Sequence, residues 1–296
     1  MKKVLILGAT GNIAGIAAKL LSENTEISLR LASSRAEGLA KLKEQYPQCE
    51  VVQADWHDVD SLKAAFQGVH RVMVNVPDFL TDETIVTPTI VAAARSTPSL
   101  EQLVRLIALD PDFCVSKMTK EWLATRGGSA LSYVAKPILD ASGLPVTYVN
   151  VVSWIGFNLI GMAAEDVKLH RRMPFYADAP RSWLAEQDIA EIFAKILAEG
   201  PTRHLGQHYV ITGPHKYWFN DVARMLSDEV GAEVKWIDTP DKLHELMGPL
   251  GDTAITYFQH EQKGWDKLPI TNTAKELLGR EPMSLREYIH LNREFF

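Results

Sequence analysis

An α/β fold with a doubly wound parallel sheet is the fold class that this sequence predicts. Residues 4–7 form an apolar run that ends on Gly8, which indicates a buried strand, and residues 13–21 carry apolar side chains at helical spacing. Further apolar runs then alternate with helical segments along the first half of the chain. Repeated units of one strand and one helix imply parallel strands joined by right-handed crossovers, with helices on both faces of the sheet.

The turn between the first strand and the first helix has the glycine spacing of a dinucleotide-binding site. Gly8, Gly11 and Ala14 follow one another at intervals of three, which is the G-x-x-G-x-x-G/A variant of the Rossmann fingerprint. Gly8 makes the tight turn, Gly11 lets the backbone approach a pyrophosphate, and Ala14 lets the helix lie close to the sheet. The helix N-terminus offers unpaired N–H groups to the phosphates. The sequence therefore predicts a Rossmann-type sheet that binds a dinucleotide.

The next elements continue the alternation as far as residue 109. Strands are expected over residues 4–7, 27–33, 50–54, 71–76 and 102–109. Helices are expected over residues 13–21, 37–46, 59–66 and 88–95. Pro47 and Gly68 end two of these helices, and Asp110-Pro111-Asp112 forms a turn after the fifth strand.

The pattern is looser in the second half of the chain. Helices are expected over residues 119–124, 129–141, 188–199 and 220–230, and strands over residues 145–152 and 207–212. Asn220 is the expected N-cap of its helix, and Ser284 with Glu287 forms a capping box before the last one. Residues 153–182 look irregular, which suggests an inserted segment that covers a substrate.

Two regions follow from this arrangement. Residues 1–152 are expected to form an NAD(P)-binding Rossmann domain. Residues 153–296 are expected to form mainly a smaller, substrate-covering α/β region, with some elements packing back on the first domain.

Composition and charge exclude several classes of protein. The chain has 31 Lys and Arg against 37 Asp and Glu, a formal net charge of −6 without a basic block, which argues against nucleic-acid binding. Cys49 and Cys114 are far apart and lack a His cluster, so neither a disulfide scaffold nor a metal site is expected. The apolar run after Lys3 is too short for a signal peptide or a membrane span. We expect a cytoplasmic monomer or homodimer that acts on a small molecule, with no nucleic acid and no membrane as partner.

Six motifs, ordered along nearly the whole chain, resemble the NmrA-like branch of the atypical short-chain dehydrogenases. They are GATGNIAG at 8–15, QADWHD at 53–58, SGLPVTYV at 142–149, WIGFN at 154–158, DIA at 188–190 and GQHYVITG at 206–213. That branch includes NADPH-dependent quinone and azo-type reductases, isoflavone-reductase-like enzymes and nucleotide-sensing regulators. The resemblance implies a Rossmann fold that binds NAD(P)H.

The resemblance also implies which residues meet the cofactor. The residues that it places on the pyrophosphate are Gly8, Thr10, Gly11, Asn12 and Ile13. The residues that it places on the adenine are Asp55 and Trp56, and on the ribose and nicotinamide Asn75, Val76 and Pro77. These positions follow the first, third and fourth strands, at the edge where a doubly wound sheet binds nucleotides. A turn or helix cap is the alternative role for Asp55.

The end of the second strand indicates NADP rather than NAD. An acidic residue there accepts hydrogen bonds from the ribose 2′-hydroxyl of NAD, whereas arginine accommodates the 2′-phosphate of NADP. The sequence has Ser33, Ser34 and Arg35, so the guanidinium can pair with the phosphate and the hydroxyls can donate to it. A solvated surface arginine is the alternative, with NAD(H) as the second cofactor.

The catalytic residues depart from the family pattern. Short-chain dehydrogenases use a Tyr-x-x-x-Lys pair, in which lysine lowers the pKa of the tyrosine that donates a proton. The corresponding helix has Tyr133 and Lys136, three residues apart, which still share one helix face. They are the catalytic candidates, and a surface helix face with a packed tyrosine is the alternative. The family's Arg-Pro after the sixth strand is replaced by Asn150-Val151.

Trp154, Phe157 and Asn158 are the candidates for a substrate pocket near the nicotinamide. Aromatic rings give an apolar slot, and an amide can orient a polar group. Core packing is the alternative for the aromatic side chains.

These features lead to two hypotheses of different kinds. The first is an NADPH-dependent oxidoreductase that transfers hydride to a small conjugated or aromatic acceptor such as a quinone, enone, imine or carbonyl. The second is a non-catalytic regulator that senses NADP(H), which the loss of the Tyr-x-x-x-Lys spacing favours. An epimerase-like use of bound NADP has less support, because it needs the missing proton relay.

Overall fold

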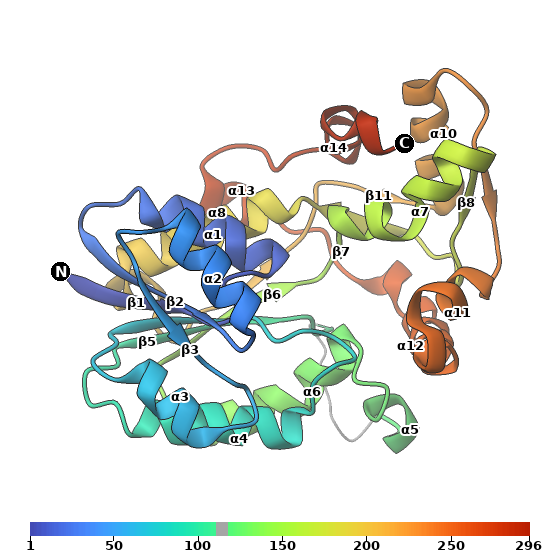
Figure 1. The fold of residues 1–296 in the computed structure, drawn as a ribbon. Helices are drawn as coiled ribbons and strands as arrows, with labels where there is room; N and C mark the ends of the chain where they lie inside the picture. Colours follow the sequence, from blue (N-terminus) through green and yellow to red (C-terminus); the bar gives the residue numbers. More distant parts are fainter. Residues whose placement is uncertain (111–117) are drawn as a thin grey trace. The chain divides into compact units, whose positions relative to one another are not determined.

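The computed structural model describes residues 1–110 and 118–296 (Figure 1). Cys114 and the expected turn at Pro111-Asp112 therefore lie outside the described residues. The chain divides into two compact units that alternate along the sequence. Unit 1 consists of Met1–Leu109, Leu131–Asn150 and Ile189–Tyr209, and unit 2 consists of Asp110–Ala130, Val151–Asp188 and Val210–Phe296.

A seven-stranded sheet forms the centre of unit 1. Its strands are β1 (Lys2–Ile6), β2 (Ile27–Ser33), β3 (Glu50–Gln53), β4 (Arg71–Val74), β5 (Gln102–Ile107), β6 (Val146–Val151) and β10 (His208–Ile211). The spatial order is β10-β6-β5-β4-β1-β2-β3, and β1 pairs in parallel with both β2 and β4. The strand order reverses between β1 and β4, so this is the switch point at which a doubly wound sheet binds its ligand.

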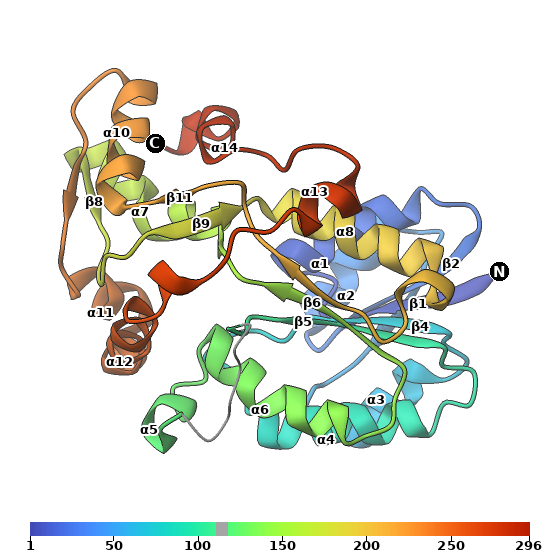
Figure 2. The ribbon, with the colours of Figure 1, turned by 180° about the vertical axis from the view of Figure 1, so that it is seen from behind.

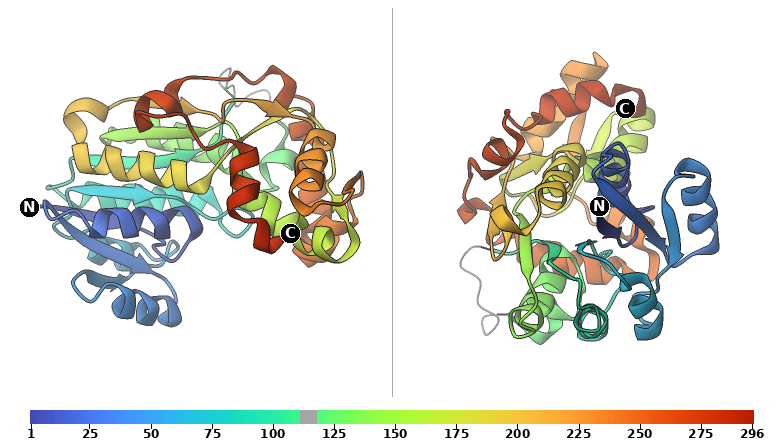
Figure 3. Two further views of the ribbon diagram at one scale, coloured as in Figure 1. Left: turned by 90° about the horizontal axis from the view of Figure 1, so that it is seen from above. Right: turned by 90° about the vertical axis from the view of Figure 1, so that its left-hand side faces the viewer.

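Helices cover both faces of this sheet. Figures 1 and 2 show α1, α2 and α8 on one face and α3, α4 and α6 on the other, and Figure 3 shows the arrangement from two further sides. Their bounds are α1 (Asn12–Ser22), α2 (Ala36–Gln45), α3 (Val59–Phe66), α4 (Glu83–Arg95), α6 (Gly128–Asp140) and α8 (Glu186–Glu199), and the short α9 (Pro201–His204) follows. The buried apolar runs that predicted the strands fill the space between the layers, with Val4, Leu5 and Ile6 fully buried. The predicted doubly wound fold is confirmed.

Two helix starts differ from the sequence-based expectation. The helix expected from Pro88 begins at Glu83, because the Asp82 carboxylate accepts the Thr84 N–H at 2.9 Å and caps the helix one turn earlier. The helix expected to have Asn220 as its N-cap, α10 (Phe219–Val230), begins one residue before it. Here the Asp221 carboxylate accepts the N–H of Trp218, the actual N-cap, at 3.1 Å.

Unit 2 is built from two small sheets and the remaining helices. The three-stranded sheet has the order β11-β9-β7, with β7 (Trp154–Ile155), β9 (Arg181–Leu184) and β11 (Lys216–Tyr217). The two-stranded sheet pairs β8 (Arg172–Pro174) with β12 (Lys235–Ile237). The helices, besides α10, are α5 (Lys120–Leu123), α7 (Gly156–His170), α11 (Asp241–Met247), α12 (Gly251–Gln262), α13 (Thr273–Leu278) and α14 (Leu285–Leu291).

The expectation that residues 153–182 are irregular is wrong. The segment holds β7, β8, the start of β9 and the 15-residue helix α7. The first residue of α7, Gly156, lies close to another side chain: a Cβ there would lie 2.6 Å from the ring of Tyr288, so glycine fits this position and a larger residue would force a shift. A further helix start is confirmed, since the Ser284 hydroxyl caps α14 by accepting the Glu287 N–H at 3.1 Å.

Candidate functional site

The turn between β1 and α1 forms a cradle of backbone N–H groups at the switch point of unit 1. Gly8 has a φ of 64°, a left-handed conformation that favours glycine. The Gly11 N–H donates to the Gly8 carbonyl at 2.8 Å, and a Cβ on Gly11 would lie 3.2 Å from that oxygen. Gly11 is the N-cap of α1, and no side chain caps the helix. The first N–H groups of α1 therefore remain available to an anion.

The other residues predicted for the pyrophosphate lie in the same turn. Thr10 is half-buried, and Gly11 and Asn12 are exposed. Ile13 is 5% exposed, so its side chain belongs to the core and its backbone N–H is the group that can meet a ligand. The close backbone approach and the uncapped helix end fit a bound pyrophosphate.

Trp56 lies against this turn. After β3, the Trp56 ring comes within 3.4 Å of the position that a Cβ on Gly8 would take. Asp55 shapes its own turn, because its carboxylate accepts the His57 N–H at 3.0 Å. The carboxylate that caps α3 is that of Asp58, which accepts the N–H groups of Asp60 and Ser61. The structure thus brings Trp56 to the glycine turn, and gives Asp55 the bonds of a turn residue.

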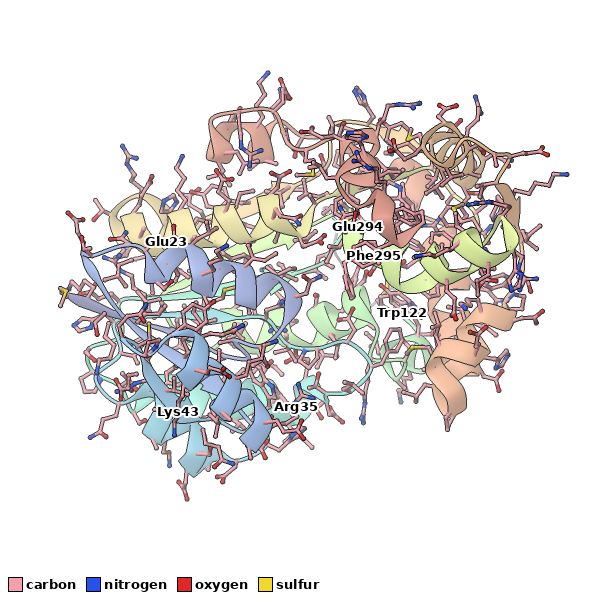
Figure 4. All side chains as sticks on the ribbon, turned by 45° about the horizontal axis from the view of Figure 1, so that its top comes forward. Glu23, Arg35, Lys43, Trp122, Glu294 and Phe295 are labelled. Carbon is pink, nitrogen blue, oxygen red and sulfur yellow. The ribbon has the colours of Figure 1, made fainter. Side chains whose placement is uncertain are left out.

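The end of β2 presents Arg35 to solvent. Ser33 is 3% exposed, and its hydroxyl accepts the Arg35 N–H at 3.3 Å, so it shapes the turn from within. Ser34 and Arg35 are exposed. Figure 4 labels Arg35 at the start of α2 and Lys43 near its end. Of the three residues predicted for the 2′-phosphate, Ser34 and Arg35 have side chains that solvent reaches.

The backbone after β4 leaves the sheet beside the glycine turn. The Leu7 N–H donates to the Met73 carbonyl at 3.2 Å, which ties the end of β1 to β4. Asn75 is half-buried, Val76 is 6% exposed and Pro77 is exposed. The Pro77 carbonyl accepts a hydrogen bond from the Thr81 hydroxyl at 2.8 Å, which links the two ends of this loop segment.

The two catalytic candidates lie on α6, in different surroundings. Tyr133 is 5% exposed. The Lys136 ammonium lies 2.6 Å from an Asp140 carboxylate oxygen and 4.7 Å from the centroid of the Tyr148 ring. The Tyr148 hydroxyl donates to the same carboxylate at 2.7 Å, and burial followed by this bond raises the pKa of Tyr148. The Lys136 charge is thus engaged one helical turn further along α6.

Asn150 and Ser132 are residues whose role the sequence analysis missed. Both are buried, and both bond to the backbone that follows β5. The replacement of Arg-Pro by Asn150-Val151 was the available signal, but spacing alone does not reveal the partner of a buried amide.

The predicted pocket residues belong to unit 2. Trp154 is 5% exposed and packs in an aromatic core with Phe175, Trp183 and Phe219. Phe157 is 49% exposed, and its backbone N–H donates to the Glu186 carboxylate at 3.1 Å.

The third predicted pocket residue, Asn158, follows on α7 and is half-buried. The pocket role of all three residues stays a prediction.

Two further features bear on the class of protein. Within residues 1–110 and 118–296, no group of three or more His, Cys, Asp and Glu side chains is placed to hold a metal ion. In the same part of the chain, every helix is too short or too polar to cross a membrane.

Solved structures with the same fold include both enzymes and a regulator. An NADPH-dependent quinone oxidoreductase of Escherichia coli, complexed with NADPH, is 19% identical, with a TM-score of 0.79 over 98% of this chain and 99% of that chain. The triphenylmethane reductase of a Citrobacter species, complexed with NADP(H), is 17% identical, with a TM-score of 0.77 over 97% and 99%. NmrA, a negative transcriptional regulator in complex with NADP, is 18% identical, with a TM-score of 0.76 over 98% and 94%.

The fold expected from the NmrA-like resemblance is therefore confirmed. A search by sequence among curated proteins finds no match. The model of the NAD(P)H-binding family matches residues 8–155, half of the chain, from the glycine turn to β7. The chain belongs to the NAD(P)H-binding family.

Proposed function

We propose that the protein is an NADPH-dependent oxidoreductase that transfers hydride to a small conjugated or aromatic acceptor, such as a quinone, enone, imine or carbonyl compound. The observation that carries the cofactor preference is the exposed Arg35 at the end of β2, beside an uncapped glycine turn. An arginine there suits a 2′-phosphate, with which it forms charge-assisted hydrogen bonds. The solved structures with the same fold include two NADP(H)-bound reductases, which supports the proposal by analogy.

The residues of unit 1 have separate tasks in this function. The first N–H groups of α1 hold the pyrophosphate, and the close approach at Gly11 requires that no side chain intervene. Arg35 holds the 2′-phosphate, and Trp56 borders the adenine side of the glycine turn. When bound, the reduced nicotinamide supplies the hydride. The chain has to bind, orient and shield the acceptor beside it.

The proton that follows the hydride has two sources in this proposal. The Tyr133 hydroxyl is the side-chain candidate on α6. A lysine assists such a tyrosine when its charge lies near the phenol oxygen, but the Lys136 charge is paired with Asp140 at 2.6 Å. Protonation by water is the alternative, and suits acceptors whose reduced form is stable as an anion.

A nucleotide-sensing regulator is the second candidate function. The pairing of Lys136 with Asp140 favours it, because a protein without turnover needs no assisted proton donor. Such a protein would bind NADP(H) through the same glycine turn and Arg35, without consuming the cofactor.

One experiment separates the two functions. The purified protein is mixed with NADPH and with a panel of quinones, enones, imines and carbonyl compounds, and the loss of NADPH absorbance is followed. Gly11→Val is the negative control, because the valine side chain would fill the space of the pyrophosphate. Circular dichroism should show that this variant is folded, and it should fail to bind NADPH. Oxidation of NADPH by the natural protein and not by Gly11→Val supports the oxidoreductase. Tight binding of NADPH by the natural protein without oxidation supports the regulator.

Arg35→Asp tests the cofactor preference in the same protein. Loss of a charge-assisted hydrogen bond costs about 1.5–3 kcal/mol, so we expect NADPH affinity to fall roughly 10- to 150-fold. The preference for NADPH over NADH should be abolished or reversed, because the new carboxylate can accept a hydrogen bond from the ribose 2′-hydroxyl of NADH. Fluorescence titration with both cofactors measures the effect. Equal affinities for NADPH and NADH, unaltered by the substitution, would remove Arg35 from the site.

A further inference from the structure

Side-chain hydrogen bonds hold the backbone of Ala108 and Leu109, directly after β5. The Ala108 N–H donates to the Ser132 hydroxyl at 2.8 Å. The Leu109 N–H donates to Asn150 Oδ1 at 2.7 Å, and Asn150 Nδ2 donates to the Leu109 carbonyl at 3.0 Å. Asn150 is 0% exposed, Leu109 is 2% exposed and Ser132 is 3% exposed, so water does not replace these bonds.

The Asn150 amide takes the place of a strand partner. The ladder between β5 and β6 ends with Ile107 opposite Asn150, and the chain then leaves the sheet. The amide offers one acceptor and one donor to the two backbone groups of Leu109, as a neighbouring strand would. A shorter, apolar or purely accepting side chain does not supply both. The amide therefore fixes the direction in which the chain departs from β5.

This held backbone lies on the side of the switch point opposite to Arg35. The glycine turn stands between β1 and α1, and Arg35 and Trp56 follow β2 and β3 on one side of it. A dinucleotide that extends from the pyrophosphate in both directions then has its other half at the carboxyl ends of β4 and β5. Ala108 and Leu109 are the first residues beyond β5 at that edge.

We propose that Asn150 and Ser132 are positioning residues, which hold the Ala108-Leu109 backbone against the nicotinamide half of the cofactor. The inference rests on the proposed function for its effect on turnover. The two side chains act through the backbone and do not touch the reacting atoms. A small displacement of a positioned group costs up to about 10²-fold in rate.

The test compares Asn150→Leu and Asn150→Asp with Thr147→Val as a matched control. Thr147 lies on the same strand and is 0% exposed. Thr147 precedes Asn150 by three residues. Its hydroxyl donates to the His204 carbonyl at 2.7 Å and accepts a hydrogen bond from Gln102 Nε2 at 3.1 Å. The control therefore loses a comparable set of buried hydrogen bonds away from the carboxyl edge. Ser132→Ala, which removes the acceptor of the Ala108 N–H, serves if the Asn150 variants fail to fold.

Two readouts are measured on each folded variant: kcat with the best acceptor, and the fluorescence of bound NADPH, which reports the surroundings of the nicotinamide. We expect Asn150→Leu to lower kcat tenfold or more and to change the fluorescence, with the Kd for NADPH within about threefold of the natural value. Asn150→Asp should lie between, because it still accepts the Leu109 N–H. Thr147→Val should match the natural protein in both readouts.

The two readouts separate failure of the inference from failure of the proposed function. If the natural protein binds NADPH and oxidises it with none of the acceptors, the oxidoreductase proposal fails, and the fluorescence still decides on the positioning role. Unchanged fluorescence in Asn150→Leu and Ser132→Ala, or equal changes in Thr147→Val, would overturn the inference.

Discussion

The substitution Gly38→Ala tests how unit 1 builds the turn that carries Arg35. A change from glycine to alanine within a helix ordinarily stabilises a protein by up to about 1 kcal/mol. At Gly38, a Cβ would lie 2.2 Å from Ser33 Oγ, 3.0 Å from Ser33 Cβ and 3.2 Å from Thr10 Cγ2. Overpacking of this kind costs about 1–3 kcal/mol. Rotation of the Ser33 side chain would relieve the overlap with its hydroxyl. The same rotation would remove the acceptor of the Arg35 N–H, and this hydrogen bond is worth about 0.5–1.5 kcal/mol.

We therefore expect Gly38→Ala to lower the free energy of unfolding by about 1–2 kcal/mol, against the usual sign for a helix. Because the turn also sets the path of Ser34 and Arg35, we expect weaker binding of NADPH relative to NADH. Urea denaturation followed by circular dichroism measures the first effect, and fluorescence titration the second.

Gly161→Ala is the matched control for Gly38→Ala. Gly161 also lies within a helix, but a Cβ there would meet its nearest neighbour, the Phe157 ring, at 3.9 Å. This variant should be as stable as the natural protein or up to about 1 kcal/mol more stable. The double variant Ser33→Ala/Gly38→Ala loses the closest overlap, so it should be less destabilised than the sum of the single variants by about 1 kcal/mol. A Gly38→Ala protein more stable than the natural one would refute the reasoning.

Two further predictions concern α6 and unit 2. If Tyr133 donates the proton, Tyr133→Phe should lower turnover roughly 10²–10⁴-fold at unchanged NADPH affinity. The turnover of Lys136→Ala should stay within about threefold of the natural value, because the Lys136 charge is paired with Asp140. Equal losses of turnover for the two variants in steady-state assays would contradict this prediction. Asp166 is buried, which raises its pKa, but hydrogen bonds from Lys242 and Arg172 lower the pKa below its ordinary value overall. The ionised Asp166 carboxylate therefore stabilises the folded protein above the unfolded pKa of about 3.9, and this stabilisation is lost as the pH falls through the lower pKa of the folded state. We expect the urea midpoint of the natural protein to fall in this pH range, and to fall less in Asp166→Asn.

The sequence predicted the sheet of unit 1 because its strands are continuous apolar runs between strong turn signals. β2 and α3 have the predicted bounds, and β1, the strand before the glycine turn, starts two residues earlier than expected, at Lys2. A strand of this kind can be predicted without knowing its distant partners, because burial on both faces of the sheet leaves little room for polar residues. The glycine spacing at Gly8 and Gly11 likewise reports a local backbone requirement.

The roles of single polar side chains were beyond the reach of sequence patterns. The sequence offered the Ser33 hydroxyl to a phosphate, but its bond to the Arg35 N–H and its burial depend on the packing of Gly38. The helix α7 was not predicted because its glycines and small residues weaken the helical apolar spacing. At its first residue, Gly156, the ring of Tyr288, 132 positions further along, leaves no room for a Cβ. These are long-range contacts, which no local period encodes.

Arg181 shows why an aromatic motif does not by itself indicate a pocket. Its guanidinium lies 4.6 Å from the ring centroids of both Trp154 and Phe219, and donates to the carbonyls of Ala177 and Ala179 at 2.6 and 3.0 Å. Burial lowers the pKa of Arg181 to about 10, so the cation keeps its charge at neutral pH while the ring faces and carbonyls replace its water. Aromatic faces are thus required in this core to accommodate a charge, and the rings come from separate elements. Trp154, 5% exposed, contacts this cation within the core, whereas the ring of Phe157 at the start of α7 is 49% exposed to solvent.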